Sequence, residues 1–190
     1  NMEAKLISHH EHNLHVAIPK LLSLLEEGES VALVSDAGYP AISDPGYEMV
    51  VATIDAGYNV VPLSGCNACL DALVVSGIAP QPFMFYGFLS HTNKNKTKEL
   101  EKLKNITYTI VFYEAPHRIK ATLDCMMKVL GDRKIALCRE ITKKHEEILR
   151  GTISEVLEVV DELKGEMVIV VEGGTEVNEE ETFDQTITEH

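Results

Sequence analysis

Two short stretches of the sequence carry the residues best suited to handling a proton. IVFYEAPHR places Glu114 and His117 directly after an apolar run, and CREITKK places Glu140 and Lys143 after another. Carboxylate, imidazole and amine groups can accept a proton or align a polar substrate. These four residues are therefore our candidate catalytic groups, although their spacing assigns a role to none of them.

Each candidate also has a purely structural interpretation. Glu114 can cap a helix that begins at Pro116, and His117 can lie in the exposed first turn of that helix. Glu140 can pair with its neighbour Arg139. The sequence leaves both interpretations open.

Two turns follow the apolar run at residues 31–35, in the order SDAGYP and SDPG. Gly38 permits a positive φ or the close approach of a ligand, and Asp36 can accept hydrogen bonds in the turn. Loops beyond strand ends bind ligands in open α/β sheets, so SDAGYP is a candidate binding loop, although a plain structural loop is more common. In SDPG, Asp44 and Pro45 predict an N-cap followed by the first helical residue.

A cluster of lysines supports a nucleic-acid hypothesis. The segment HTNKNKTKELEKLK, residues 91–104, contains five lysines, although the whole chain carries a net charge of -13. Residues 175–190 hold six of the thirty acids, and without them 24 acids face 17 bases, a net charge of -7. Local charge can therefore favour RNA while the total does not. A solvated helix face explains the same lysines equally well.

Other features exclude several classes of protein. The four cysteines lie in apolar segments and predict reduced, buried thiols in a cytoplasmic protein: Cys66, Cys69, Cys125 and Cys138. A single CxxC and a histidine cluster without partner carboxylates at defined spacing predict no metal site. No apolar stretch approaches the ~18 residues of a membrane span. Neither a GxGxxG nor a Walker-type motif is present.

Strands and helices are predicted to alternate, which favours an α/β protein with helices against a largely parallel sheet. The expected strands are residues 31–35, 59–63, 83–88, 107–113, 134–138 and the segment EMVIVVEGG, residues 166–174. The expected helices are a segment marked by Leu21, Leu22, Leu24 and Leu25 that ends at Gly28, then residues 45–56, 66–77, 116–130 and 154–163, together with the lysine-rich segment.

Six motifs occur in a fixed order: SDAGYPAISDPG, VVPLSGCNACLDALVVSGI, YGFL before the lysines, IVFYEAPHR, CREITKKHEEILRG and KGEMVIVVEG. Over residues 7–174 this series resembles the tetrapyrrole methylase-like family of S-adenosylmethionine-dependent methyltransferases. FYEAPHR, REITK and KGE resemble its RNA-methylating branch rather than the porphyrin and corrin enzymes. The resemblance implies a two-domain α/β fold, a methyl donor in the interdomain cleft and a homodimer. It also implies 2'-O-methylation of a cytidine ribose in 16S ribosomal RNA of the small ribosomal subunit.

The resemblance also implies which residues form the site. The donor-binding positions are Asp36, Ala37, Gly38, Asn67, Ala68, Tyr113 and Glu114, the last two through backbone contacts to the adenosine portion. The candidate RNA-binding residues are Lys94, Lys96, Lys98 and Arg118.

The chain departs from the family pattern in ways that set further expectations. Family members place a strand, a PTPIGNL-like loop and an EDTR-like segment ahead of the HxHN element, which here is already found at residues 10–13. We therefore expect an N-terminally truncated chain, an inactive fragment that binds the donor weakly or not at all. Tyr39 stands where a threonine is usual, and SGC at residues 64–66 stands where PGP is usual.

The expected organisation is a remnant of the N-terminal α/β domain (1–63), a C-terminal α/β domain (64–174) and a disordered acidic tail (175–190). Two other interpretations stay open. One is a small-molecule methyltransferase acting on a tetrapyrrole, and the other is a non-catalytic, dimerising relic of the fold.

Overall fold

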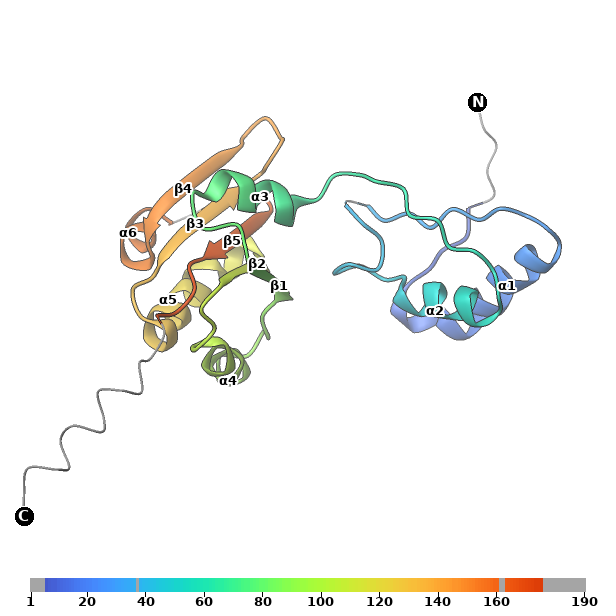
Figure 1. Ribbon diagram of the computed structural model, residues 1–190, viewed down its shortest axis with the longest axis horizontal. Helices are drawn as coiled ribbons and strands as arrows, with labels where there is room; N and C mark the ends of the chain where they lie inside the picture. The colour runs from blue at the N-terminus through green and yellow to red at the C-terminus, as the bar shows by residue number, and fades with distance from the viewer. Residues whose placement is uncertain (1–5, 37, 161–162, 176–190) are drawn as a thin grey trace, which may run out of the picture. The chain divides into compact units, whose positions relative to one another are not determined.

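The computed structural model describes residues 6–36, 38–160 and 163–175 and divides the chain into two compact units, residues 1–67 and 68–190 (Figure 1). Of the predicted acidic tail, only Thr175 lies within the described residues. Helices and a five-stranded sheet make up the described chain, which confirms the predicted α/β class.

The first unit is built on two helices that pack together. A short 3-10 helix, η1 (Glu11–Asn13), leads into α1 (Leu14–Glu26), and α2 (Tyr47–Asp55) packs against α1. Their small core joins three buried side chains: Ala17, Leu21 and Met49. Partly buried side chains of Ile18, Leu25 and Leu33 pack against this core.

The strands predicted at residues 31–35 and 59–63 are wrong. Both segments lack strand structure, and Val34 and Val61 are exposed by 77% and 74%. A strand is stabilised by hydrogen bonds to a neighbouring strand, and the described part of this unit offers none. The apolar residues alone therefore do not produce strands here.

The predicted cap of α2 is also wrong. The helix begins at Tyr47, its N-cap is Gly46 with φ 145°, and no side chain caps it. A Cβ at Gly46 would lie 2.9 Å from Leu33 Cδ2, so both the backbone conformation and the packing require glycine there.

The second unit contains a five-stranded sheet in the order β1-β2-β5-β3-β4. Its strands are β1 (Phe83–Phe88), β2 (Thr109–Glu114), β3 (Lys134–Arg139), β4 (Glu147–Thr152) and β5 (Met167–Val171). Only β1 and β2 pair in parallel, so the prediction of a largely parallel sheet is wrong. The cause is β5, which runs antiparallel to both of its neighbours and separates β2 from β3. Strands β1, β2 and β3 nevertheless share one direction and end at the same edge.

Helices cover both faces of this sheet. The bounds are α3 (Ala68–Ser76), α4 (Asn93–Leu103), η2 (Pro116–Arg118), α5 (Ile119–Leu130) and α6 (Ile153–Val159). Alternate residues of β2 divide between the faces, because Ile110 and Phe112 pack with α4, α5 and α6 while Val111 packs with α3. The two cores hold β2, β3 and β5 rigidly and thereby fix the edge where the strands end.

Candidate functional site at the ends of the strands

The strand register brings the predicted catalytic residues to one edge of the sheet. Glu114 at the end of β2 and Arg139 at the end of β3 both pair with Met167, the first residue of β5. Strands two places apart lie roughly 9–10 Å from each other. The segment after β2, which contains His117, and the segment after β3, which begins with Glu140, therefore leave the sheet close to each other.

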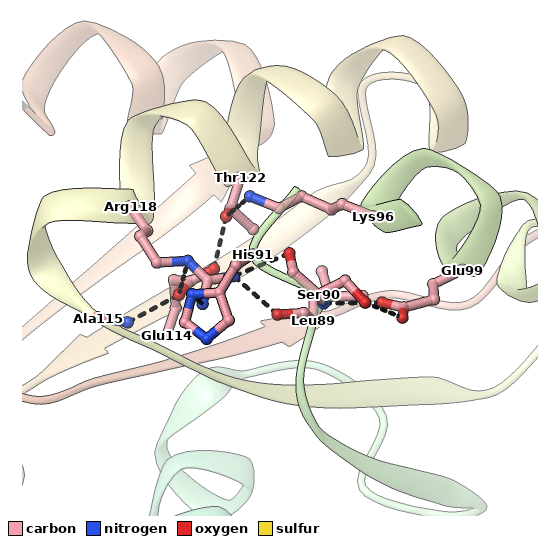
Figure 2. Close-up of polar contacts among 9 residues, drawn as sticks. All are labelled: Leu89, Ser90, His91, Lys96, Glu99, Glu114, Ala115, Arg118 and Thr122. Atoms are coloured by element: carbon pink, nitrogen blue, oxygen red, sulfur yellow. Dashed lines mark hydrogen bonds and ion pairs between the residues drawn. The ribbon is translucent and has the colours of Figure 1, made fainter. Parts of the chain in front are cut away.

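Arg118 fixes the loop that follows β1 (Figure 2). Its Nη2 donates hydrogen bonds to the carbonyl oxygens of Leu89 at 2.7 Å and Ser90 at 3.1 Å. Its Nη1 lies 3.0 Å from His91 Nδ1. Because a guanidinium can only donate, this contact makes His91 Nδ1 the acceptor. Arg118 thus ties the segment after β2 to the segment after β1.

Glu114 is the buried acceptor at the centre of this network (Figure 2). The residue is 3% exposed, and its carboxylate accepts hydrogen bonds from the Ala115 backbone at 2.8 Å and Thr122 Oγ1 at 2.5 Å. Arg118 Nε lies 3.2 Å from Glu114 Oε1. Both oxygens have partners and the side chain is only 1% exposed, so a substrate hydroxyl cannot reach the Glu114 carboxylate. Its burial argues against the predicted proton-accepting role and favours the structural interpretation, in which it accepts from the backbone that begins η2.

Lys96 extends the network from α4 into the core. It is 1% exposed, and its Nζ donates to Thr122 Oγ1 at 2.7 Å. Burial lowers the pKa of Lys96, whereas the Glu114 charge raises it. This burial contradicts the predicted contact of Lys96 with RNA phosphates. The sequence contained the signal, because Lys96, Leu100 and Leu103 recur at the helical spacing of one buried face.

The other predicted RNA-contacting residues have different environments. Lys94 and Lys98 are exposed on α4, as a phosphate contact requires. The Arg118 side chain is only 10% exposed and directs most of its donors into the protein, which argues against its predicted role in binding RNA.

Glu140 and Lys143 form an ion-pair cluster with Glu166. Lys143 Nζ lies 3.2 Å from Glu140 Oε1 and 2.8 Å from Glu166 Oε2, and the Glu166 backbone N–H donates to Glu140 Oε1 at 2.8 Å. The bond from Glu166 and the Lys143 contact lower the pKa of Glu140, and hydrogen bonding to Glu166 and Glu140 raises the pKa of Lys143. Both shifts favour the charged form: Glu140 becomes a weaker base, and Lys143 stays protonated and has no free lone pair to accept a proton.

The predicted donor loop lies in the first unit. Gly38 has φ 77°, as expected for the turn, and the Ser35 hydroxyl donates to the Gly38 carbonyl oxygen at 3.2 Å. Asp36 is exposed, and Ala37 lies outside the described residues. The Tyr39 hydroxyl accepts from the Gly65 N–H at 3.0 Å, so the two departures from the family pattern contact each other.

The remaining donor-binding candidates lie at the unit boundary and in the second unit. Asn67 is the last residue of the first unit and Ala68 begins α3, whereas Tyr113 and Glu114 end β2. Within the second unit the structure brings Glu114 together with Lys96 and Arg118, whereas Asp36 and Gly38 belong to the first unit. Sequence reasoning missed Thr122, which lies eight residues after Glu114 and carries no motif.

Three of the four cysteines are buried, as predicted, and Cys66 is exposed, which the prediction missed; all four are free thiols. Within residues 6–36, 38–160 and 163–175, no helix is long and apolar enough to cross a membrane. The same described residues contain no cluster of three side chains that could hold a metal ion.

Comparisons with known proteins agree with this architecture. A family model described as Tetrapyrrole (Corrin/Porphyrin) Methylases matches residues 4–157. A Bacillus subtilis protein named Ribosomal RNA small subunit methyltransferase I is 54% identical over 98% of this chain and 65% of its own length. A protein of the same name from Halalkalibacterium halodurans is 46% identical over 99% of this chain and 66% of its own length. The chain thus spans slightly less than two thirds of these relatives.

Solved structures share the fold at low sequence identity. The methyltransferase CobJ superposes with a TM-score of 0.64 at 19% identity, covering 87% of this chain and 72% of CobJ. A Thermus thermophilus uroporphyrin-III C-methyl transferase, complexed with S-adenyl homocysteine, gives a TM-score of 0.57 at 17% identity. That match covers 85% of this chain and 73% of the other. At such low identities, both comparisons show a shared fold and nothing more.

Proposed function

We propose, from the premise that this chain belongs to the tetrapyrrole (corrin/porphyrin) methylase family, that it is part of an RNA methyltransferase. The reaction is transfer of a methyl group from S-adenosylmethionine to the ribose 2'-oxygen of a cytidine in 16S ribosomal RNA. The observation that carries the proposal is the 54% identity, over 98% of the chain, to a relative named as a ribosomal RNA methyltransferase. The corrin and porphyrin enzymes are only 17–19% identical and carry no argument about the substrate.

The loop at Gly38 fits a contact with the methyl donor. A Cβ at this position would meet nothing within 4 Å, so a ligand can approach the backbone there. We assign Asp36 and Gly38 to donor binding, with Ala37, Asn67, Ala68, and the backbone of Tyr113 and Glu114 as further contacts. When bound, S-adenosylmethionine supplies an electrophilic methyl carbon, which leaves its sulfur as a new bond to the ribose oxygen forms.

His117 is the residue that we propose takes the proton of the ribose hydroxyl. It is exposed in η2, three residues after the end of β2, and histidine is the side chain that most often acts as a general base. Glu114 is buried and already hydrogen-bonded, and the ion-pair cluster makes Glu140 a weaker base and keeps Lys143 protonated. His117→Ala should lower turnover by roughly two to four decades. His15→Ala, which changes an exposed histidine on α1, is the matched control.

Lys94 and Lys98 support RNA as the substrate. They lie four residues apart on the exposed face of α4, so both ammonium groups can meet the same phosphate backbone. An RNA strand presents a continuous row of phosphates, and such a row favours clustered lysines.

Mass spectrometry of ribosomal RNA tests the proposal directly. Cells that lack the gene should lose one 2'-O-methylcytidine from 16S ribosomal RNA, and a plasmid copy of the gene should restore it. An unchanged methylation pattern would contradict the proposal. Restoration of a tetrapyrrole product instead would favour the small-molecule alternative.

We also propose that the enzyme is a cytoplasmic homodimer. The family resemblance implies the dimer. Light scattering of the purified protein measures its mass, and a concentration-independent monomer would contradict the dimer. The cytoplasmic location follows from the proposed ribosomal substrate.

A further inference from the structure

Strand β1 contains a β-bulge two residues before its end. Phe85 pairs with Val111 of β2, but the next pairing joins Gly87 to Phe112, so Tyr86 is an extra residue. Gly87 has φ 82°, in the left-handed region that glycine occupies at little cost. The sequence of the strand, FMFYGF, thus supplies the glycine at the position where the chain must bend.

The bulge changes the face on which Phe88 lies. Side chains alternate between the two faces of a regular strand, which would place Phe88 opposite to Phe85. The extra residue instead pairs Phe88 with Tyr113, on the face of the sheet that carries Phe85 and α3. Phe88 is consequently 53% exposed rather than packed with Tyr86 against the larger core.

Three aromatic rings meet on this face. Phe85 and Tyr113 lie 4.8 Å apart at an interplanar angle of 64°, and Phe88 and Tyr113 lie 5.7 Å apart at 67°. Both are edge-to-face contacts, which hold the rings in defined orientations. We call Phe85, Phe88 and Tyr113 the aromatic shelf. It lies where the parallel pair β1 and β2 ends.

We propose that the aromatic shelf binds an unpaired base of the substrate RNA by stacking on Phe88, an inference that rests on the proposed function. Proteins that bind single-stranded nucleic acid combine exposed aromatic rings with cations that follow the phosphates. Only residues 89–92 separate Phe88 from α4, and α4 carries the exposed Lys94 and Lys98. Arg118 fixes this connection through Leu89 and Ser90, so the shelf and the lysines are joined by an ordered segment.

The absence of tryptophan from the chain gives a direct test. Phe88→Trp introduces a sole tryptophan on the shelf, and stacking of a base on it should quench its fluorescence. The probe is a single-stranded oligocytidylate of about nine nucleotides. The matched control is Phe83→Trp, because Phe83 lies on the same strand, at its other end, and is 37% exposed. We expect strong, saturable quenching of the first variant and none of the second.

Affinity measurements separate stacking from other contacts. Phe88→Ala should weaken binding of the same probe about 5- to 150-fold, with an unchanged dependence on salt, because no charge is lost. Phe88→Leu should weaken it similarly, since leucine is apolar but has no ring face. Full affinity of the leucine variant would overturn the proposal in favour of a simple apolar contact.

The remaining outcomes are equally decisive. Equal quenching of both tryptophan variants, or no quenching at all, overturns the shelf. Quenching by S-adenosylhomocysteine but not by RNA assigns the shelf to the donor and overturns its RNA role. If the unaltered chain binds the probe and loses affinity on Lys94→Ala/Lys98→Ala but not on Phe88→Ala, the shelf fails while the proposed function stands. A chain that binds no RNA at all counts against both.

Discussion

Glu114→Gln should strongly destabilise the second unit. The Glu114 side chain is 1% exposed, and its carboxylate faces only donors, from Ala115, Thr122 and Arg118. The amide of glutamine would direct an N–H group at one of these donors and would leave the Arg118 charge without its partner. Removal of one partner of a buried ion pair costs about 3–5 kcal/mol, so we expect a loss of that size in the free energy of unfolding.

Urea unfolding monitored by circular dichroism measures this loss. The control is Glu147→Gln, the same substitution at a carboxylate that pairs with Arg139 at 3.0 Å but is 41% exposed. Exposed pairs contribute about 0.2–1 kcal/mol, so the control should change little. If Glu114→Gln costs no more than Glu147→Gln, the structural role assigned to Glu114 is refuted.

A second substitution tests the wider network. Once Glu114 is neutral, Lys96 and Arg118 remain as two buried cations without the carboxylate between them. Lys96→Met should therefore destabilise the unaltered protein but cost less in the Glu114→Gln background, with a coupling energy of about 0.5–3 kcal/mol. Strictly additive losses would show that the two side chains do not interact.

Four other substitutions or conditions have defined outcomes. Lys94→Ala/Lys98→Ala should reduce the slope of log affinity for RNA against log salt by about 1.4–1.8, and an unchanged slope would leave these lysines as a solvated face. A thiol reagent at pH 8 should modify Cys66 rapidly and the buried cysteines only after unfolding; rapid modification of all four would contradict their burial. Burial raises the pKa of Cys138 from 9.0 to about 11. The neutral Cys138 thiol therefore contributes fully to stability below pH 9, and this contribution is lost as the pH rises to 11. Cys138→Ala should reduce the resulting decline in the free energy of unfolding. Gly87→Ala should lower the free energy of unfolding by about 1–2 kcal/mol because it forces alanine to φ 82°, and a smaller loss would mean that the bulge rearranges freely.

Local sequence patterns predicted most of the elements but not their pairing. The β-branched run before Glu114 and the glycine after Leu130 predicted β2 and the end of α5, because both signals lie within the element itself. Nothing local indicates that β5 inserts between β2 and β3, because strand order depends on contacts between distant residues. The strand predicted at residues 31–35 is wrong for the same reason, because a strand needs hydrogen bonds to a neighbouring strand and local sequence does not show whether one is there.

The candidate site was predictable in position but not in the state of its side chains. Motifs placed Glu114 and His117 just after a strand, and the structure has Glu114 as the last residue of β2 and His117 in η2. Burial then separates the two residues, because Thr122 and Arg118 enclose Glu114 while His117 is exposed. The sequence does not show that Thr122, eight residues later and one helix away, accepts from Lys96 and donates to Glu114.

The central position of β5 has a consequence for the order of folding. β5 comes last of the five strands in the chain, yet it alone bridges β2 and β3. During synthesis, β1–β2 and the β3–β4 hairpin can each form early, but residues 167–171 must leave the ribosome before the two halves join. Until then one edge of β2 and one edge of β3 have no partner strand, and an unpaired edge can pair with a strand of another chain. The sheet therefore closes only after residues 167–171 have been synthesised, through contacts far apart in sequence, which is the slow kind of folding.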